Sequence, residues 1–223
     1  MPRLRQVHKA DAHPFAQTLY QMLFGDRDPV DHPGTATGTP GNWWTVFALV
    51  PDAFDHTTAG FQFYRSPNRR LTPRLRELGQ IRAGWNVGSQ FVFSQHCKAA
   101  RDCGFTEEQV QAIPSWSVHD CWTPVDRALL AYTDCLTLQH GRVPEALFDR
   151  LKELLSDEEI LEFTYVTCTY AMHATMSRAL RLEYDDVDDP VREHADPNGN
   201  FGGLDVMRMV DTGDGSGTSA GGK

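Results

Sequence analysis

An imidazole and a carboxylate occupy two consecutive stretches of the chain that both have helical patterning. His96 lies in SQFVFSQHCKAA, and the residues one turn before and after it are apolar, so its ring faces an apolar stripe. Glu77 lies in the preceding stretch, RLRELGQIR. If the two helices pack antiparallel, the carboxylate can reach the imidazole, fix its tautomer and support proton transfer. His96 and Glu77 are therefore candidate catalytic residues.

Both residues also have a purely structural interpretation. Most buried histidines only satisfy their own hydrogen bonds within the core. Glu77 is flanked by Arg74, Arg76 and Arg82, which is typical of an ordinary surface ion-pair cluster. The geometry between the two side chains decides between these interpretations and acid/base chemistry.

An aromatic-rich stretch between Trp116 and Trp122 contains a second acid/base pair, His119 and Asp120. Loops that carry such residues often bind substrates, and we include His119 and Trp122 among the candidate substrate-binding residues. The alternative is an exposed loop whose tryptophans cover the end of a helix.

Two further candidates, Tyr170 and His173, share one face of a long apolar stretch at positions i and i+3. Their alternative role is packing between subunits, with hydrogen bonds across helices. Gln90 could donate a hydrogen bond to a developing oxyanion.

No cofactor or metal motif is present in the sequence. The chain has no GxGxxG, GxxxxGK[ST], HExxH, CxxC or GxSxG pattern, which argues against a nicotinamide cofactor, a P-loop nucleotide, structural zinc and an α/β-type hydrolase. The five cysteines, at 97, 103, 121, 135 and 168, are odd in number and lie in helix-like segments. They indicate reduced thiols rather than a disulfide framework.

The charge balance narrows the classes of partner. Lys and Arg total 21 and Asp and Glu total 30, giving a net charge of −9, which argues against nucleic acid and anionic membranes as partners. No run approaches 18 uncharged apolar residues, and no apolar stretch follows the cations at the start. We expect a cytoplasmic protein.

Cap residues divide the middle of the chain into helices. Thr72-Pro73, Ser89, Thr106 with Gln109, Thr123 with Asp126, and Ser156 with Glu159 each mark a helix start. No hairpin dipeptide separates alternating runs, so we predict an all-α bundle of about six to eight helices. Residues 1–40 are expected to form a helix and a long loop, 41–185 the helical domain, and 186–223 an acidic, then Gly/Ser-rich, flexible tail.

Three segments together resemble one known superfamily. They are LTPRLRELGQIRAGWNVGSQFVFSQHCKAARDCGFTEEQVQAI, WTPVDRALLAYTDCL and ILEFTYVTCTYAMHATMSRALRLEYD. Over about residues 43–185 the chain resembles the carboxymuconolactone decarboxylase and alkyl hydroperoxidase D-like superfamily. The resemblance implies an all-α homo-oligomer, as a dimer, trimer or hexamer, with a pocket among helices of adjacent subunits. It also implies that the protein uses no metal and no organic cofactor.

The resemblance carries over to functional positions only in part. The redox members have a glutamate followed by CxxCxxxH; the glutamate corresponds to Glu77 and the histidine to His96, whereas the two cysteine positions hold Ser89 and Val92. A hydroxyl and an isopropyl group cannot form the thiolate or disulfide that reduces a peroxide. Non-redox members often have Tyr-Glu-Trp just before the histidine, where this chain has Phe-Val-Phe.

We expect a cofactor-independent acid/base enzyme that decarboxylates, isomerises or cleaves a small cyclic or aromatic carbonyl or lactone compound. His96 would move a proton at carbon, Glu77 would stabilise the imidazolium, and an enolate-holding group would come from Ser89, Gln90 or His119. The expected substrate-binding residues are Trp85, Ser89, Gln90, Phe93, His119, Trp122, Tyr170 and His173. The alternatives are a thiol-dependent hydroperoxide reductase using Cys97 with Cys103 or Cys121, and a non-catalytic binding or assembly module.

Overall fold

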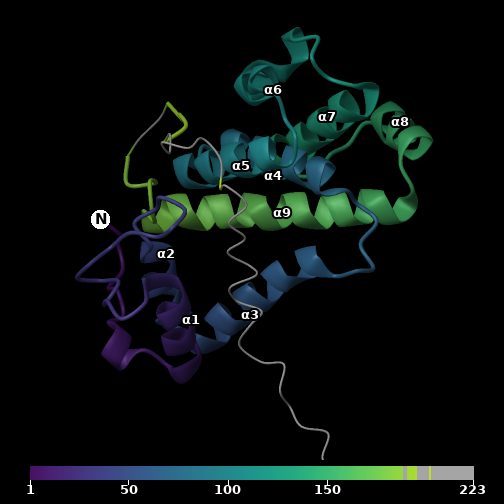
Figure 1. Ribbon diagram of the computed structural model, residues 1–223. Coiled ribbons are helices and arrows are strands. Elements are labelled where there is room, and N and C mark those ends of the chain that lie inside the picture. The colour runs from purple at the N-terminus through teal and green to yellow at the C-terminus, as the bar shows by residue number, and fades with distance from the viewer. Residues whose placement is uncertain (188–189, 195–200, 202–223) are drawn as a thin grey trace, which may run out of the picture.

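The computed structural model describes residues 1–187, 190–194 and 201, and in these residues the regular secondary structure is helical (Figure 1). Nine α-helices and three short 3-10 helices account for the regular structure, and no strand occurs among the described residues. The α-helices are α1 (Pro14–Phe24), α2 (Asn42–Phe47), α3 (Pro51–Gln62), α4 (Pro73–Val87), α5 (Gln90–Asp102), α6 (Glu107–Ala112), α7 (Pro124–Leu138), α8 (Glu145–Leu154) and α9 (Asp157–Leu180). The 3-10 helices are η1 (Lys9–Asp11), η2 (Phe63–Arg65) and η3 (Ile113–Val118). The all-α prediction is confirmed.

The number of α-helices exceeds the predicted six to eight because the sequence pattern does not mark α2 and α3. Helix α2 follows Gly41, which is in the left-handed conformation, and α3 follows Val50. Neither start has a side-chain cap hydrogen bond, so the signal used for the other helices is missing there. The predicted tail falls mainly on residues outside the described part of the chain.

The predicted helix starts in the middle of the chain are confirmed. Thr72 accepts a hydrogen bond from the Leu75 amide, and Ser89 accepts one from the Val92 amide. Reciprocal capping boxes open α6, α7 and α9 at Thr106, Thr123 and Ser156. These caps satisfy amide groups that a helix cannot pair internally.

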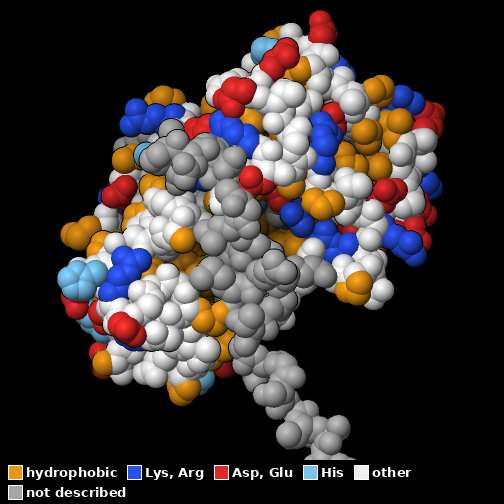
Figure 2. Space-filling view, in the orientation of Figure 1, with side chains coloured by type: hydrophobic (Ala, Val, Ile, Leu, Met, Phe, Trp, Pro, Cys, Tyr) orange, Lys and Arg blue, Asp and Glu red, His pale blue; other side chains and the backbone are white. Residues whose placement is uncertain are grey.

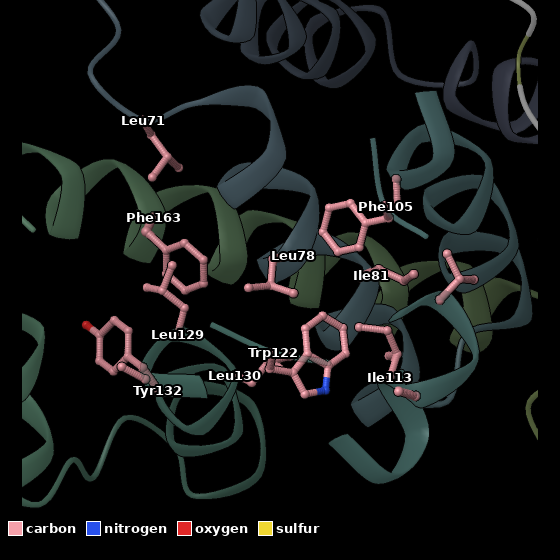
Figure 3. Close-up of a cluster of buried hydrophobic side chains, with 14 of the residues drawn as sticks. Leu71, Leu78, Ile81, Phe105, Ile113, Trp122, Leu129, Leu130, Tyr132 and Phe163 are labelled. Atoms are coloured by element: carbon pink, nitrogen blue, oxygen red, sulfur yellow. The ribbon is translucent and has the colours of Figure 1, made fainter. Parts of the chain in front are cut away.

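Helix α4 lies at the centre of the main bundle and packs against α5, α7 and α9. Leu78 and Ile81 of α4 are fully buried and join Leu129 and Phe163 in the main core, which Figure 3 shows. Glycine allows the neighbouring helices to approach closely. A Cβ on Gly84 would lie 2.8 Å from the Phe93 backbone nitrogen of α5.

The Gly84→Ala substitution is expected to lower the free energy of unfolding by about 2 kcal/mol, because the new methyl group meets backbone atoms that cannot rotate away. The matched control is Gly60→Ala in α3, where an added Cβ meets nothing within 4 Å. There the gain in helix propensity is expected to raise stability by up to about 1 kcal/mol. Urea unfolding of both variants checks the opposite signs; equal stabilisation at both positions would contradict this packing.

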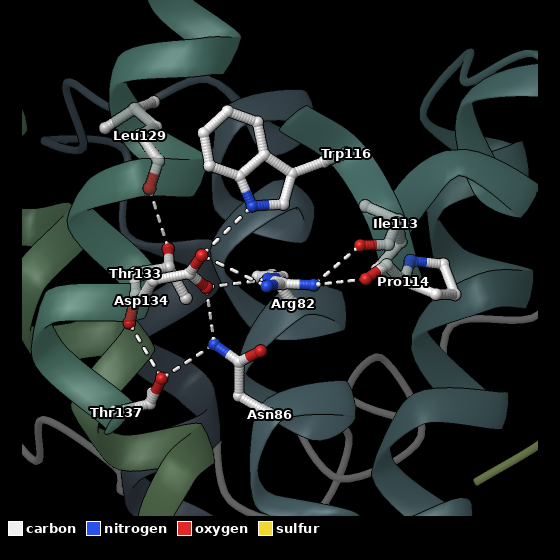
Figure 4. Close-up of polar contacts among 9 residues, drawn as sticks. All are labelled: Arg82, Asn86, Ile113, Pro114, Trp116, Leu129, Thr133, Asp134 and Thr137. Atoms are coloured by element: carbon white, nitrogen blue, oxygen red, sulfur yellow. Dashed lines mark hydrogen bonds and ion pairs between the residues drawn. The ribbon is translucent and has the colours of Figure 1, made fainter. Parts of the chain in front are cut away.

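A buried ion pair connects α4 with α7. Arg82 donates from Nε and Nη2 to the two carboxylate oxygens of Asp134 at 2.7 and 3.0 Å, and from Nη1 to the Ile113 carbonyl. Asn86 and the Trp116 indole also donate to Asp134 (Figure 4). Because Arg82 and Asp134 form a bidentate pair with further donors, their contact fixes the position of α7 and η3 relative to α4.

A second hydrophobic core joins the N-terminal segment to α2, α3 and the segment that follows α9. Tyr20, Trp43 and Phe54 are buried there together with Leu182. The buried Glu183 carboxylate accepts hydrogen bonds from the amides of Gly41 and Trp43 at 2.8 and 2.7 Å. This core therefore spans the predicted boundary at residue 40.

Charged side chains of both signs are interspersed over the part of the surface formed by α6, α7 and α8 (Figure 2). Within the described residues, no helix combines the length and the apolar character that a bilayer crossing requires.

Candidate functional site

A cavity of about 470 Å³ lies between the N-terminal segment and helices α3, α4, α5 and α9. Its volume is in the range of small-molecule sites in proteins. Its aromatic walls come from Trp43, Trp44, Phe61, Tyr64, Phe91 and Tyr170. Its polar lining includes Arg76, Glu77, Gln80, Gln95, His96 and His173. A space lined by aromatic rings and by several polar side chains is suited to a small planar ligand.

The structure brings Glu77 and His96 into direct contact on the cavity wall. His96 Nδ1 lies 2.7 Å from Glu77 Oε2, and the two side chains are 12% and 4% exposed. Burial alone would raise the pKa of the Glu77 carboxyl, but His96 and Arg76 outweigh burial and hold this pKa below its usual range. The ionised carboxylate therefore accepts the Nδ1 proton, which leaves Nε2 as the basic nitrogen in the neutral ring.

Two further side chains of α4 hold the Glu77 carboxylate. Arg76 donates from Nε and Nη2 to Glu77 Oε1 at 3.0 and 2.9 Å. With its amide nitrogen turned toward Glu77, Gln80 donates to both oxygens at 3.0 and 3.2 Å. Since Arg76 neutralises the carboxylate and Gln80 orients it, Glu77 remains a buried anion that can face an imidazolium.

Two tyrosines lie beside the imidazole. The Tyr170 ring meets the His96 ring edge to face, with centroids 4.5 Å apart, and the Tyr64 ring lies 5.9 Å from that of Tyr170. Burial raises the pKa of both phenols, so both remain protonated donors at neutral pH. The site thus places hydroxyl donors next to a base.

His173 lies deeper in the aromatic wall. Its ring stacks on Trp43 at 6.0 Å and lies 5.4 Å from Phe61. Burial, with a smaller contribution from His96, lowers its pKa from 6.5 to about 4. His173 is therefore neutral at physiological pH and forms part of the aromatic lining.

All five cysteines are free thiols, and Cys103 alone of the five lines the cavity. Burial raises the pKa of Cys103 to about 11 and raises the pKa of Cys97 further. Cys97 is fully buried within the main core. Raised pKa values keep these sulfurs as thiols, which are weak nucleophiles.

Ser89 and Gln90, both predicted to bind substrate, lie outside the cavity lining. The Ser89 hydroxyl donates to Asp185 Oδ2 at 2.5 Å and caps α5. Gln90 Oε1 lies 2.7 Å from His194 Nε2. Both side chains connect α5 to the segment that follows α9. Their role is therefore to hold these two parts of the chain together.

The other four predicted binding residues that lie outside the cavity belong to the main core or the surface. Phe93 and Trp122 are buried in the core, and Trp85 packs edge to face against Phe93 at 5.4 Å. His119 pairs with Ser115 on an exposed turn. Of the ten predicted site residues, the cavity brings together Glu77, His96, Tyr170 and His173.

Sequence reasoning missed several residues that complete the site. Gln80 lies one helical turn after Glu77, at i+3, a spacing that could have identified it. Arg76 is the preceding residue, at i−1, and its side chain reaches Glu77 without sharing its helix face. Tyr64 and Trp43 come from segments with no recognisable cap or motif, so no sequence signal pointed to them.

Comparison with known proteins finds relatives over the region that contains the contact between Glu77 and His96. Residues 51–134 match the model of the carboxymuconolactone decarboxylase family, and this range includes both Glu77 and His96. The uncharacterized protein YdfG of Bacillus subtilis (strain 168) is 29% identical over 92 residues, which are 41% of this chain and 63% of YdfG. The chain thus matches somewhat less than two thirds of that curated relative's length.

Solved structures share the fold. The alkylhydroperoxidase AhpD core of an uncharacterized peroxidase-related protein from Ralstonia eutropha JMP134 has a TM-score of 0.62 and 17% identity, covering 82% of this chain and 95% of its own. The debrominase Bmp8 has a TM-score of 0.59 and 12% identity, covering 88% and 92%. A protein of unknown function from Agrobacterium tumefaciens has a TM-score of 0.56 and 24% identity, covering 66% and 96%. Residues 51–134 therefore match the carboxymuconolactone decarboxylase family, and the chain shares the fold of alkylhydroperoxidase D-like proteins.

Proposed function

We propose that this chain is a cofactor-independent acid/base enzyme that moves a proton at carbon in a small cyclic or aromatic carbonyl or lactone compound. The observation that carries the proposal is the 2.7 Å contact between His96 and the ionised Glu77 on the wall of a cavity of about 470 Å³. A carboxylate that orients an imidazole beside a ligand-sized space is the arrangement that general base catalysis needs.

In the proposed reaction, His96 Nε2 takes a proton from the carbon next to the substrate carbonyl, and the electron pair of that bond moves onto the carbonyl oxygen. The resulting imidazolium is stabilised by Glu77, whose charge Arg76 fixes in place. Returning the proton to a different carbon completes an isomerisation. Expulsion of a leaving group from the carbon beyond the same type of enolate gives a lyase step. In a decarboxylation, the bond to the carboxylate breaks in place of the C–H bond, carbon dioxide leaves, the electron pair forms the enolate, and the protonated His96 gives a proton to that carbon.

The developing enolate oxygen needs a hydrogen-bond donor, and we assign this role to Tyr170 with Tyr64. Both line the cavity, and Tyr170 meets the His96 ring directly. They replace Ser89, Gln90 and His119, which lie outside the cavity. A protonated phenol with a raised pKa donates a strong hydrogen bond without losing its proton.

The aromatic walls favour a planar ring as substrate. Trp43, Phe61 and Tyr64 provide apolar faces and exclude water, which strengthens the charge interactions around His96. We place the reaction in the cytoplasm, where five free thiols stay reduced.

The direct test is deuterium exchange. The purified protein is incubated in D₂O with a panel of lactones, β-keto acids and cyclic ketones, and NMR records deuterium at the carbon next to the carbonyl. We expect at least one compound to exchange or react, and we expect a His119→Gln control to behave as the wild type. Absence of exchange and turnover across the panel would favour the non-catalytic binding module.

A thiol-dependent hydroperoxide reductase is the second candidate, because Cys103 lines the cavity. We expect peroxide to leave the number of titratable thiols unchanged, since the pKa of all five sulfurs is raised by burial. Titration with a thiol reagent before and after peroxide measures this. A loss of thiols that a dithiol restores, and that Cys103→Ser prevents, would support the reductase instead.

A further inference from the structure

His173 is a buried imidazole that has no hydrogen-bond partner among the described residues. It is 6% exposed and lines the cavity from α9. The rings of Trp43, Phe61 and Tyr170 lie next to it, with centroids 6.0, 5.4 and 5.7 Å from its own. Leaving a buried polar group unpaired costs free energy, so most buried histidines have a hydrogen-bond partner. Packing alone therefore explains His173 poorly, and the cavity is the space from which a partner can come.

The two imidazoles that line the cavity have different surroundings. His96 contacts the ionised Glu77 carboxylate at 2.7 Å, which suits it to accept and hold a proton. Within the described ranges no carboxylate pairs with His173, and its pKa of about 4 keeps it neutral. A neutral imidazole has one N–H donor and one acceptor nitrogen. His173 therefore offers the cavity an uncharged donor, whereas His96 offers it a base.

We propose that His173 is a second catalytic residue, whose N–H group donates a hydrogen bond to the carbonyl oxygen of the substrate. This inference rests on the proposed function and adds the direction in which the substrate lies. Tyr170 contacts both imidazoles, with its ring centroid 4.5 Å from that of His96 and 5.7 Å from that of His173. The carbonyl oxygen then lies at the end of the cavity formed by Tyr170 and His173, and the carbon that loses its proton faces His96.

The proton balance of this step gives the two histidines separate tasks. The proton leaves carbon for His96 Nε2, the electron pair of the C–H bond moves onto the carbonyl oxygen, and the N–H bond of His173 stays intact. A neutral imidazole is a very weak acid, so it can polarise the carbonyl without giving up its own proton. Its hydrogen bond strengthens as the oxygen becomes charged, which lowers the barrier.

The aromatic wall holds this donor in a fixed orientation. The imidazole of His173 stacks on Trp43 with 24° between the ring planes, and its centroid lies 5.4 Å from that of Phe61. A donor that is already oriented needs no reorganisation when the oxygen becomes charged. The same apolar surroundings disfavour a charged His173, so the group that it binds is an uncharged acceptor, the carbonyl of a ketone or a lactone.

The first test observes the carbonyl group directly and does not require turnover. The probes are four planar cyclic carbonyl compounds, each labelled with ¹³C at the carbonyl: indanone, tetralone, coumarin and phthalide. Isotope-edited infrared spectroscopy records the carbonyl stretching frequency of each probe bound to the full chain, and titration gives its Kd. His173→Phe keeps an aromatic ring but has no donor, whereas His173→Gln keeps an N–H donor.

We expect the bound carbonyl to have a higher stretching frequency in His173→Phe than in the wild type, because its bond is less polarised. The Kd is expected to rise by about 2- to 10-fold, the range for one lost hydrogen bond. His173→Gln should recover part of both effects, and His119→Gln, on an exposed turn, should match the wild type. If His173→Phe does not fold, His173→Leu gives the same comparison, since it also lacks a donor.

The second test is kinetic and uses a substrate identified by deuterium exchange. We expect kcat to fall by about 10²-fold in His173→Phe, the scale for removal of one donor to a developing oxyanion. The change in KM should be smaller, because the hydrogen bond is strongest when the oxygen is charged.

Two results would overturn the inference. One is a stretching frequency in His173→Phe equal to that of the wild type, and the other is a wild type that binds none of the four probes. A protein that polarises a bound carbonyl through His173 yet catalyses no exchange would support the hydrogen bond and count against the proposed function instead.

Discussion

The His96→Gln variant is expected to lose about 10²- to 10⁴-fold in kcat/KM, the range that a positioned general base contributes. Glutamine is chosen because its amide can still donate to Glu77, so the buried carboxylate keeps a partner. The wild-type contact is the 2.7 Å approach of His96 Nδ1 to Glu77 Oε2. The variant therefore removes the basic Nε2 and changes little else in the structure.

Steady-state kinetics on the substrate found by exchange, together with thermal unfolding, measure this effect. We expect an unchanged fold and a melting temperature within a few degrees of the wild type. The control is His119→Gln, because His119 lies on an exposed turn outside the cavity. A His96→Gln protein that is strongly destabilised yet fully active would show that His96 serves only the core.

The second large expected effect is a loss of stability in acid, caused by the buried His173. Its pKa is lowered from 6.5 in the unfolded chain to about 4 in the folded one, chiefly by burial. Between these values the unfolded state binds more protons, so stability rises with pH and falls as the solution is acidified. From neutral pH to about pH 4 this one group removes about 3 kcal/mol of stability.

The His173→Phe variant keeps an aromatic ring against Trp43 and Phe61 but cannot be protonated. Relative to the wild type, it is expected to gain about 3 kcal/mol in unfolding free energy between neutral pH and pH 4. Urea titrations of both proteins at a series of pH values give this difference directly. Glu183 titrates in the same range with the opposite sign, since burial raises its pKa to about 7, but both proteins contain it and its contribution cancels. Parallel curves would refute a buried neutral His173.

The sequence predicted the helical architecture well where the signals are local. The caps at Thr72, Ser89 and Ser156 act on amides three residues away, so the pattern of adjacent residues is sufficient to reveal them. The same patterning placed Glu77 and His96 on consecutive helices and anticipated their approach.

The cavity was predicted only in part because its walls meet across long separations in the chain. Trp85, Phe93 and Trp122 have the residue types of a binding pocket, yet they fill the main core. Apolar character alone cannot distinguish a side chain that packs from one that lines a space. Trp43 lies in α2, which begins without a side-chain cap. Tyr64 lies in η2, which follows α3 directly and also has no side-chain cap. Neither segment therefore carried a sequence signal.

By itself, the sequence determined the all-α class and most helix starts, because these follow from contacts between near neighbours. It made Glu77 and His96 candidates for a contact between consecutive helices, and the packing of α4 against α5 decided that contact. The tertiary structure decided which residues surround that pair. Glu183 holds the amides of Gly41 and Trp43, some 140 residues earlier, and so brings the N-terminal aromatic wall over α4 and α9. Contacts of that separation depend on how the whole chain packs, and no local pattern of residues encodes them.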